Sequence, residues 1–396
     1  MATPSPPPPA PLPERMKAVQ VTAFNHPYEI TTVPVPIVGP HDLLVKVAVA
    51  SYCHTDGMVA SGAFHTSLPV TASHEGAGTV VAAGTSVSPE AFRPGDRVMC
   101  GLPLHPCAAC PDCVGSDGNY QQYCVNVAGH VGVHVDGCLA EFVRVDARFS
   151  TKLPPNIGFR AAAPLACAGR SAWRGVVQTG LTTGEWLLVV GAGGGLGHLA
   201  VQFARPRGLR VVAVDARDGA LELARECGAD VVVDARQGGD EDKEKCKEWV
   251  VAEVRRVTGG EGAHAALVLS DAEGATATAA AATRMHGTLV QVAQPEEVRL
   301  PFRELVFRDI RVRGSLLCSP GESRDMVRFI AERGGAGKGE GKGEGEGGIR
   351  VETVVFEGLE SIGELVRFVR SGRLRGKAVV VVDPEQLEEE KKLGAE

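Results

Sequence analysis

Residues Trp186 to Asp218 read WLLVVGAGGGLGHLAVQFARPRGLRVVAVDARD, a run of strand, glycine turn, helix, strand and acidic residue. The first strand leads into a turn whose missing side chains let the backbone approach a pyrophosphate at a helix N-terminus. The residues expected to meet the cofactor at this turn are Gly191, Gly193, Gly194, Gly195, Leu196 and Gly197. Their spacing is one residue longer than a strict G-x-G-x-x-G pattern, and with the second strand it predicts a dinucleotide-binding unit.

The second strand ends in Asp215, eighteen residues after Gly197. A carboxylate at this position accepts hydrogen bonds from both ribose hydroxyls and repels a 2'-phosphate. We therefore expect NAD as the cofactor rather than NADP. Arg217, two residues further on, would weaken that preference because it carries a positive charge.

The segments on either side of this unit differ in pattern. Downstream, strand-like and helical stretches alternate, which predicts a doubly wound parallel sheet. Upstream, short alternating segments broken by glycine and proline predict a mainly antiparallel domain. We expect an α/β protein of two domains, with a disordered proline-rich tail at 1–16, a flexible Gly/Lys/Glu-rich insertion at 334–348 and a solvated, partly helical C-terminal end.

Composition narrows the function to small-molecule chemistry. The 396 residues are 44% apolar and 22% charged, and no run of eighteen apolar residues offers a membrane span. The net charge of -7 argues against a nucleic-acid binder, which would need a basic stripe. The N-terminal tail lacks the apolar segment of a signal peptide, so we expect a cytoplasmic protein with neither a nucleic-acid nor a membrane partner.

Four of the eleven cysteines lie within eighteen residues, in the stretch CAACPDCVGSDGNYQQYC. An odd number of cysteines in a protein expected to be cytoplasmic argues against a disulfide framework. The C-x2-C-x2-C-x10-C spacing lets four thiolates converge on one ion, as structural zinc requires. The predicted ligands are Cys107, Cys110, Cys113 and Cys124.

Three further residues form a second candidate metal site. Cys53 opens CHTDG after an alternating strand, His74 and Glu75 open SHEGAG, and Cys167 lies in PLACAG. Two thiolates and one imidazole leave a fourth position open for water or a substrate oxygen, as in catalytic zinc sites. Each residue alone is weak evidence, because single buried cysteines and histidines are usually structural.

These motifs, in this order, resemble the zinc-dependent alcohol dehydrogenases of the medium-chain dehydrogenase/reductase superfamily, and most of all the yeast-like fungal and bacterial enzymes. The resemblance runs from about Lys17 to Asp383. It implies a GroES-like, mainly antiparallel catalytic domain formed by residues 17–171 and 318–396. That domain would surround a Rossmann NAD-binding domain at 172–317, with the active site between the two.

The resemblance also implies roles for individual residues. Cys53, His74 and Cys167 correspond to catalytic zinc ligands, and Cys107, Cys110, Cys113 and Cys124 to those of a structural zinc, giving two zinc ions per chain. Glu75 is the carboxylate beside the catalytic metal, Asp56 orients His74, and Thr55 bonds the substrate oxygen. The residues implied to contact the cofactor elsewhere are His54, Ser171 and Lys377.

The implied reaction is reversible hydride transfer between a primary or secondary alcohol and NAD, in class EC 1.1.1.1, by a homotetramer or, failing that, a dimer. Met58 departs from the family, since many relatives have a histidine there that ends the proton relay. Two alternatives stay open at this point. One is a zinc-free, NADPH-dependent quinone or enoyl reductase of the same superfamily, and the other is a non-catalytic NAD- and zinc-binding redox sensor.

Overall fold

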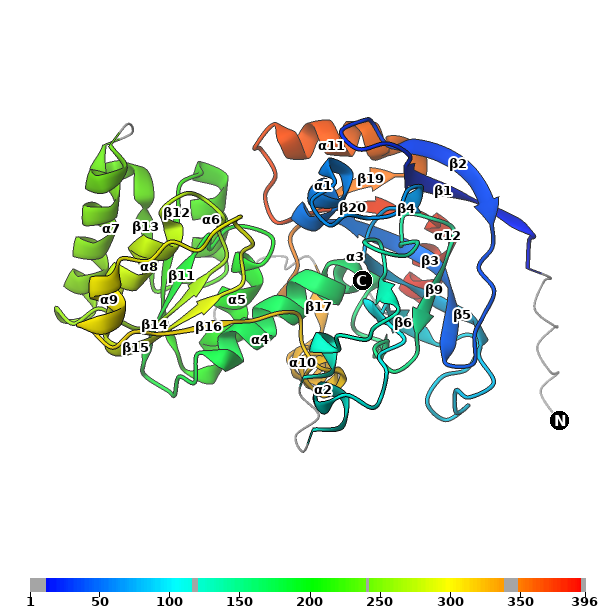
Figure 1. The fold of residues 1–396 in the computed structure, drawn as a ribbon, viewed down its shortest axis with the longest axis horizontal. Helices are drawn as coiled ribbons and strands as arrows, with labels where there is room; N and C mark the ends of the chain where they lie inside the picture. The colour runs from blue at the N-terminus through cyan, green and yellow to red at the C-terminus, as the bar shows by residue number, and fades with distance from the viewer. Residues whose placement is uncertain (1–11, 116–119, 240–241, 338–347, 393–396) are drawn as a thin grey trace.

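The computed structural model describes residues 12–115, 120–239, 242–337 and 348–392. Figure 1 shows two parts side by side, a parallel sheet with its helices on the left and a mainly antiparallel part on the right. Helices α4 and α10 lie between them. The expected fold class is confirmed, because one sheet is wholly parallel and the other mainly antiparallel.

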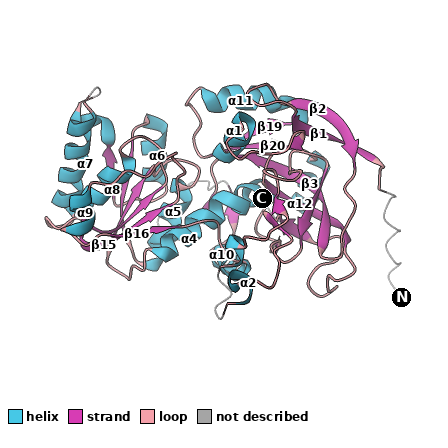
Figure 2. Ribbon diagram, viewed as in Figure 1, coloured by secondary structure: helices cyan, strands magenta, loops and turns pink. Residues whose placement is uncertain are grey.

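Six parallel strands form the sheet of the first part, in the order β13-β12-β11-β14-β15-β16. The central strand β11 is buried along its whole length, as expected of a strand covered on both faces. Figure 2 shows these strands enclosed by helices. The strands span Trp186–Val190 (β11), Arg210–Asp215 (β12), Val231–Asp234 (β13), Ala263–Val268 (β14), Thr283–Gln291 (β15) and Arg311–Gly314 (β16).

Two apolar cores cover the two faces of this sheet. Because successive side chains of a strand point to opposite faces, Leu187 and Val189 belong to one core and Leu188 and Val190 to the other. The first core is closed by α4 (Arg170–Gln178), α5 (Gly197–Ala204) and α6 (Asp218–Glu226), and the second by α7 (Lys243–Val257) and α8 (Ala275–Ala282). The short helix α9 (Phe302–Val306) precedes the edge strand β16.

The second part is built from both ends of the chain. Its main sheet has the order β10-β6-β5-β3-β20-β19, and β9 also pairs with β3. The late strand β20 lies antiparallel to the early strand β3, with Ala378 opposite Tyr52. The strands span Asp42–Tyr52 (β3), Glu75–Ala83 (β5), Arg97–Met99 (β6), Phe142–Asp146 (β9), Thr151–Lys152 (β10), Thr353–Glu357 (β19) and Lys377–Val381 (β20).

Smaller sheets and helices complete this part. The small sheets comprise β1 (Arg15–Val21), β2 (Glu29–Pro34) and β4 (Val70–Thr71), then β7 (Pro103–Leu104) with β8 (Gly129–His130), and β17 (Ala336–Gly337) with β18 (Ile349–Arg350). The helices are α1 (His54–Ser61), α2 (Pro111–Val114), α3 (Phe159–Pro164), α10 (Pro320–Glu332), α11 (Ile362–Arg370) and α12 (Pro384–Lys392). No helix among the described residues combines the length and the hydropathy that crossing a membrane requires.

The expected termini and insertion differ from the structure in three places. Strand β1 begins at Arg15, inside the predicted tail 1–16, because Met16 is buried and pairs with Val33; residues 1–11 lie outside the described residues. The insertion 334–348 contributes β17, and its residues 338–347 are not described. The C-terminal end is not wholly solvated, because the Glu390 carboxylate accepts hydrogen bonds from the Phe159 amide.

Candidate active site

The N-terminus of α1 is fixed by a carboxylate. Cys53 is the N-cap residue after β3, and its amide donates to Asp56 Oδ2 over 2.7 Å. The other Asp56 oxygen accepts from the Ser73 amide over 3.0 Å and lies 3.7 Å from His74 Nδ1. Asp56 therefore holds the loops of Cys53 and His74 together, and its position beside Nδ1 leaves His74 Nε2 as the nitrogen available for a ligand bond.

Cys167 reaches the same place from a π-helical turn, Leu165–Gly169, between α3 and α4. Such single turns within α-helices are frequent at functional sites. Arg170 is buried just after the turn, and its guanidinium group donates to the carbonyl oxygens of Ala166, Cys100 and Phe149. These bonds fix the turn that carries Cys167.

The ligand atoms of Cys53, His74, Glu75 and Cys167 all lie within 4.8 Å of one another. A hydrogen bond from Cys167, followed by the positive charge of Lys377, lowers the pKa of Cys53 despite its burial. Burial opposes a charge on His74, but the neighbouring Asp56 raises its pKa overall. A thiolate, a second thiol and a buried imidazole are the donor set that zinc prefers, so the residues present fit a zinc ion.

Glu75 forms a buried ion pair with Lys377 at the start of β20. The Nζ to Oε2 distance is 2.6 Å, and the two side chains are 5% and 0% exposed. The other Glu75 oxygen accepts from the Ala168 amide beside Cys167. The Lys377 side chain passes the glycine turn so closely that a Cβ on Gly195 would lie 2.6 Å from Lys377 Cδ. Lys377 thus spans the distance from the glycine turn to the candidate metal ligands.

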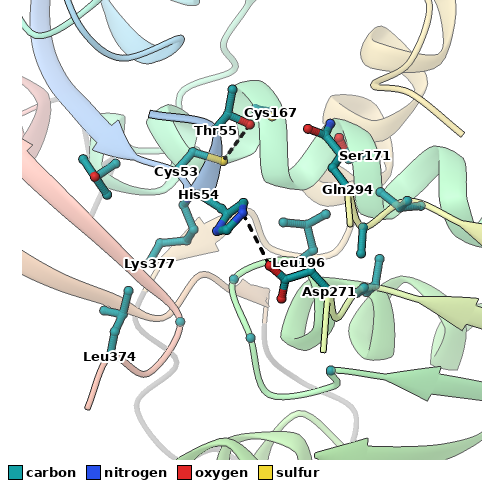
Figure 3. Close-up of a pocket in the computed structure, with 18 of the residues that line it drawn as sticks. Cys53, His54, Thr55, Cys167, Ser171, Leu196, Asp271, Gln294, Leu374 and Lys377 are labelled. Carbon is teal, nitrogen blue, oxygen red and sulfur yellow. Dashed lines mark hydrogen bonds and ion pairs between the residues drawn. The ribbon is translucent and has the colours of Figure 1, made fainter. Parts of the chain in front are cut away.

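A cavity of about 360 Å³ opens between the two parts of the molecule, and Figure 3 shows its lining. The mainly antiparallel part contributes Cys53, His54, Thr55 and Lys377, and Cys167 and Ser171 lie on the π-helical turn and α4. The Thr55 hydroxyl is 3.9 Å from Cys53 Sγ. Met58 is not among the described residues that line this cavity.

The predicted cofactor residues of the glycine turn fall into two groups. Gly191, Gly194, Gly195 and Leu196 line the cavity. Gly193 and Gly197 lie behind it: a Cβ on Gly193 would be 1.9 Å from Ala220 O, and one on Gly197 would be 2.1 Å from Gly191 O. These two glycines are required for close packing of the turn against α6 and against itself.

At the end of β12, Arg217 lines the cavity, whereas Asp215 is not among its described lining residues. One Asp215 oxygen accepts from the Gly193 amide, and the other accepts from the Ala216 amide. The Arg217 guanidinium group lies 3.6 Å from Asp215 and donates to Leu374 O. The charge of Asp215 is therefore partly balanced by Arg217, which lies between it and Leu374.

Several lining residues were missed in the sequence. His54 Nε2 lies 3.4 Å from Asp271 Oδ2 across the cavity, and Figure 3 marks this contact. Asp271 follows β14, while Val292, Ala293 and Gln294 follow β15. Ligands of open parallel sheets bind outside the carboxyl ends of the strands, so the positions directly after these two predicted strands were the available signal.

The four-cysteine lobe brings the Sγ atoms of Cys107, Cys110, Cys113 and Cys124 within 4.8 Å of one another. Backbone amides of Ala109 and Cys110 lower the pKa of Cys107 to about 6, which favours the thiolate that binds zinc. The four sulfur atoms therefore fit a second, closed zinc site. Residues 116–119 of the lobe are not described.

The lobe packs against the helices that lead from Cys167. The Arg174 guanidinium group on α4 lies 5.5 Å from the centre of the Tyr120 ring and 5.9 Å from that of Tyr123. It also forms an ion pair with Glu322 on α10, at 2.6 Å. The Tyr123 hydroxyl accepts from the Leu316 amide over 3.0 Å. The lobe thereby braces α4, which carries Ser171 into the cavity.

A dinucleotide-binding sheet facing a buried cysteine and histidine cluster defines the class of protein as an oxidoreductase with a metal site. Comparison with known protein families narrows this class to one family. Residues 39–155 match the alcohol dehydrogenase GroES-like domain, and residues 195–332 match the zinc-binding dehydrogenases. An alcohol dehydrogenase of Geobacillus stearothermophilus is 32% identical over 93% of this chain and 100% of its own length. The chain belongs to the zinc-dependent, medium-chain alcohol dehydrogenases.

Solved structures agree with this assignment. The alcohol dehydrogenase of Aeropyrum pernix is 28% identical, with a TM-score of 0.78 over 92% of this chain and 99% of that one. A structure described as an NAD-dependent alcohol dehydrogenase is also 28% identical, with a TM-score of 0.79 over 93% and 100% of the two chains. These similarities cover both parts of the molecule, so the chain is similar to these enzymes over nearly its whole length.

Proposed function

We propose that this chain is an NAD-dependent alcohol dehydrogenase, of class EC 1.1.1.1, that interconverts primary or secondary alcohols and their aldehydes or ketones. The observation that carries the proposal is the convergence of Cys53, His74 and Cys167 beside a cavity whose opposite wall is the glycine turn. An alcohol bound there would lie between a metal site and a nicotinamide. This is the arrangement that hydride transfer requires.

Zinc held by Cys53, His74 and Cys167 would supply a Lewis acid that makes the substrate hydroxyl more acidic. Thr55 lies in the cavity beside Cys53, so its hydroxyl is the group assigned to take the proton of the alcohol and pass it toward the cofactor ribose. Asp56 holds His74 in one orientation. Glu75 stays ion-paired with Lys377 beside the metal ligands. Its carboxylate would there balance part of the positive charge of the zinc ion.

The cofactor would lie along the glycine turn, with its nicotinamide near Ser171 and its pyrophosphate between His54 and Lys377. Bound NAD would supply the acceptor for the hydride of the carbinol carbon. Asp215 favours its free ribose hydroxyls, and the similarity to an NAD-dependent alcohol dehydrogenase supports the same choice. Asp271 must release His54 for the imidazole to meet a phosphate, since the two residues contact each other across the cavity.

The two alternatives have less support. A zinc-free reductase would not require Cys53, His74 and Cys167 to bring their ligand atoms within 4.8 Å of one another. A non-catalytic redox sensor would not need Thr55 in the cavity next to that cluster. The second cluster, in the four-cysteine lobe, would bind a structural zinc, so the proposal requires two zinc ions per chain.

We assign the chain to the cytoplasm and to a homo-oligomer, a tetramer in preference to a dimer. Strand β16 is the exposed edge of the parallel sheet, and Phe302, Val306 and Phe307 beside it are each at least 65% exposed. An open edge with apolar neighbours favours pairing with a second copy. Light scattering after gel filtration should give an oligomer for the wild type and smaller species for Phe307→Asp; a monomeric wild type would contradict this assignment.

The proposed activity is tested by following NADH oxidation by zinc-loaded protein with short, branched and aromatic aldehydes, with NADPH in parallel. Turnover with NADH that is lost after removal of zinc supports the proposal. Turnover that survives a chelator would favour the zinc-free reductase. No turnover with any carbonyl, at two zinc ions per chain, would favour the non-catalytic alternative.

A further inference from the structure

A second cavity, of about 320 Å³, lies between α1 and α11, which Figure 1 shows side by side. None of its described lining residues lines the first cavity. Its walls are the loop Asn25–Tyr28, Ala60 near the end of α1, and one face of α11. The volume is near the lower end of the range for small-molecule sites, about 300–1,000 Å³.

The α11 wall is a single helical face. Gly363, Val366, Arg367 and Arg370 follow a spacing of three, four and seven residues, so their side chains point the same way. Gly363 adds no side chain to this face, and the Arg367 guanidinium group lies close to it. The adjoining face of the helix points inward: Ile362 and Leu365 are buried in the core of the antiparallel part, and Val366 packs against that core.

The two charged side chains of this cavity, Arg367 and Arg370, are both positive. No Asp or Glu is among its described lining residues. Within the described part of the chain, neither guanidinium group has an ion pair or a side-chain hydrogen bond. By contrast, Arg375, just after α11, is held by both Glu222 and Glu226. Two guanidinium groups one helical turn apart offer several N–H donors to a single anion.

Part of the remaining lining is apolar. Pro27, Ala60 and Val366 present carbon surfaces beside the arginines. The guanidinium fork matches the oxygen atoms of a phosphate group, and the apolar wall leaves space for a small organic part. We infer that this cavity binds a small phosphomonoester, with its phosphate on Arg367 and Arg370 and its organic part against Pro27, Ala60 and Val366.

The cavity is connected to the active site through hydrogen bonds of its loop. The Asn25 amide donates to Ala60 O over 2.8 Å, and the Tyr28 hydroxyl donates to Asp56 O over 3.0 Å. Asp56 in turn holds the amides of Cys53 and Ser73. A ligand that orders the loop therefore restrains the helix whose N-terminus carries Cys53 and Thr55.

The test is calorimetric titration of phenyl phosphate into zinc-loaded protein saturated with NADH, so that the cofactor site is filled. We expect one phenyl phosphate per chain, and weaker binding of inorganic phosphate, which has no organic part. The double variant Arg367→Gln/Arg370→Gln should bind at least about tenfold more weakly. The matched control is Arg324→Gln, which removes an exposed arginine of α10 and should bind as the wild type does.

The inference is wrong if phenyl phosphate does not bind to the wild type, or if the double variant binds as tightly as Arg324→Gln. Equal affinities for phenyl phosphate and inorganic phosphate would overturn the organic subsite. Hydrogen exchange locates the ligand independently of activity. Added phenyl phosphate should protect amides in 25–28 and 362–370, and protection only around the glycine turn would contradict the inference.

Discussion

The buried ion pair between Lys377 and Glu75 makes a quantitative prediction about stability. The charged atoms are 2.6 Å apart, and both side chains are almost completely buried. Lys377→Met keeps most of the aliphatic stem that packs on Gly195 but leaves the Glu75 carboxylate without its cation. Removal of one partner of a buried pair costs about 3–5 kcal/mol, so we expect the free energy of unfolding to fall by that amount at neutral pH.

The loss should depend on pH in a defined direction. Burial raises the pKa of Glu75, and the charge of Lys377 is the largest influence that lowers it. Without Lys377, folded Glu75 retains a proton that the unfolded chain has already released. The stability of Lys377→Met should therefore fall as the pH rises above the ordinary carboxyl range, and its deficit should be smallest near pH 5.

Urea unfolding of the zinc-loaded protein, followed by tryptophan fluorescence at pH 5 and pH 8, measures both effects. The control is Lys377→Met/Glu75→Gln, in which neither member of the pair is left charged, and it should recover at least about 2 kcal/mol relative to the single variant. The reasoning is refuted if Lys377→Met unfolds at the same urea concentration as the wild type at both pH values, or if the double variant is as unstable as the single.

Three further predictions concern other parts of the molecule. Cys107→Ser should lose one of two zinc ions by elemental analysis and lower the melting temperature; a full zinc content would contradict a site in the lobe. Burial raises the pKa of Glu390 to about 7, so the contribution of this carboxyl group to stability should fall as pH rises from 5 to 7, by up to about 2 kcal/mol. Glu390→Gln should remove that part of the pH dependence in urea titrations. Arg217→Ala should weaken NADPH binding at least about tenfold while changing NADH binding little, as measured by fluorescence titration; equal changes would show that Arg217 does not face the 2' position.

The sequence predicted the parts of the site whose chemistry depends on residue type and spacing. Cys53, His74 and Cys167 stand in distant segments, namely CHTDG after an alternating strand, SHEGAG and PLACAG, and the structure brings their ligand atoms together. The four cysteines of the lobe were identifiable because a metal loop needs short, fixed intervals between its ligands. The two-domain α/β fold was predicted from a change in sequence pattern. Short segments that alternate apolar and polar residues precede the glycine-turn unit, whereas strand-like and helical segments alternate after it.

Contacts that depend on tertiary placement could not be predicted in the same way. Asp271 meets His54 only because the end of β14 faces α1 across the cavity. Lys377 was expected to contact the cofactor, but its ammonium group also pairs with the buried carboxylate of Glu75 on β5, which β3 separates from β20. The acidic C-terminal sequence has the composition of a solvated helix, but Leu387 and Glu390 are buried in the structure. Glu390 accepts a hydrogen bond from the Phe159 amide at the start of α3, where the N-cap residue provides no side-chain acceptor.

The central claim is that Cys53, His74 and Cys167 hold the zinc that catalysis requires. The most direct measurement compares zinc content and NAD-dependent ethanol oxidation in the wild type and in Cys53→Ser. We predict two zinc ions and turnover for the wild type, and one zinc ion with at least about a thousandfold slower turnover for the variant. A variant that kept both zinc ions and the wild-type rate would contradict the claim.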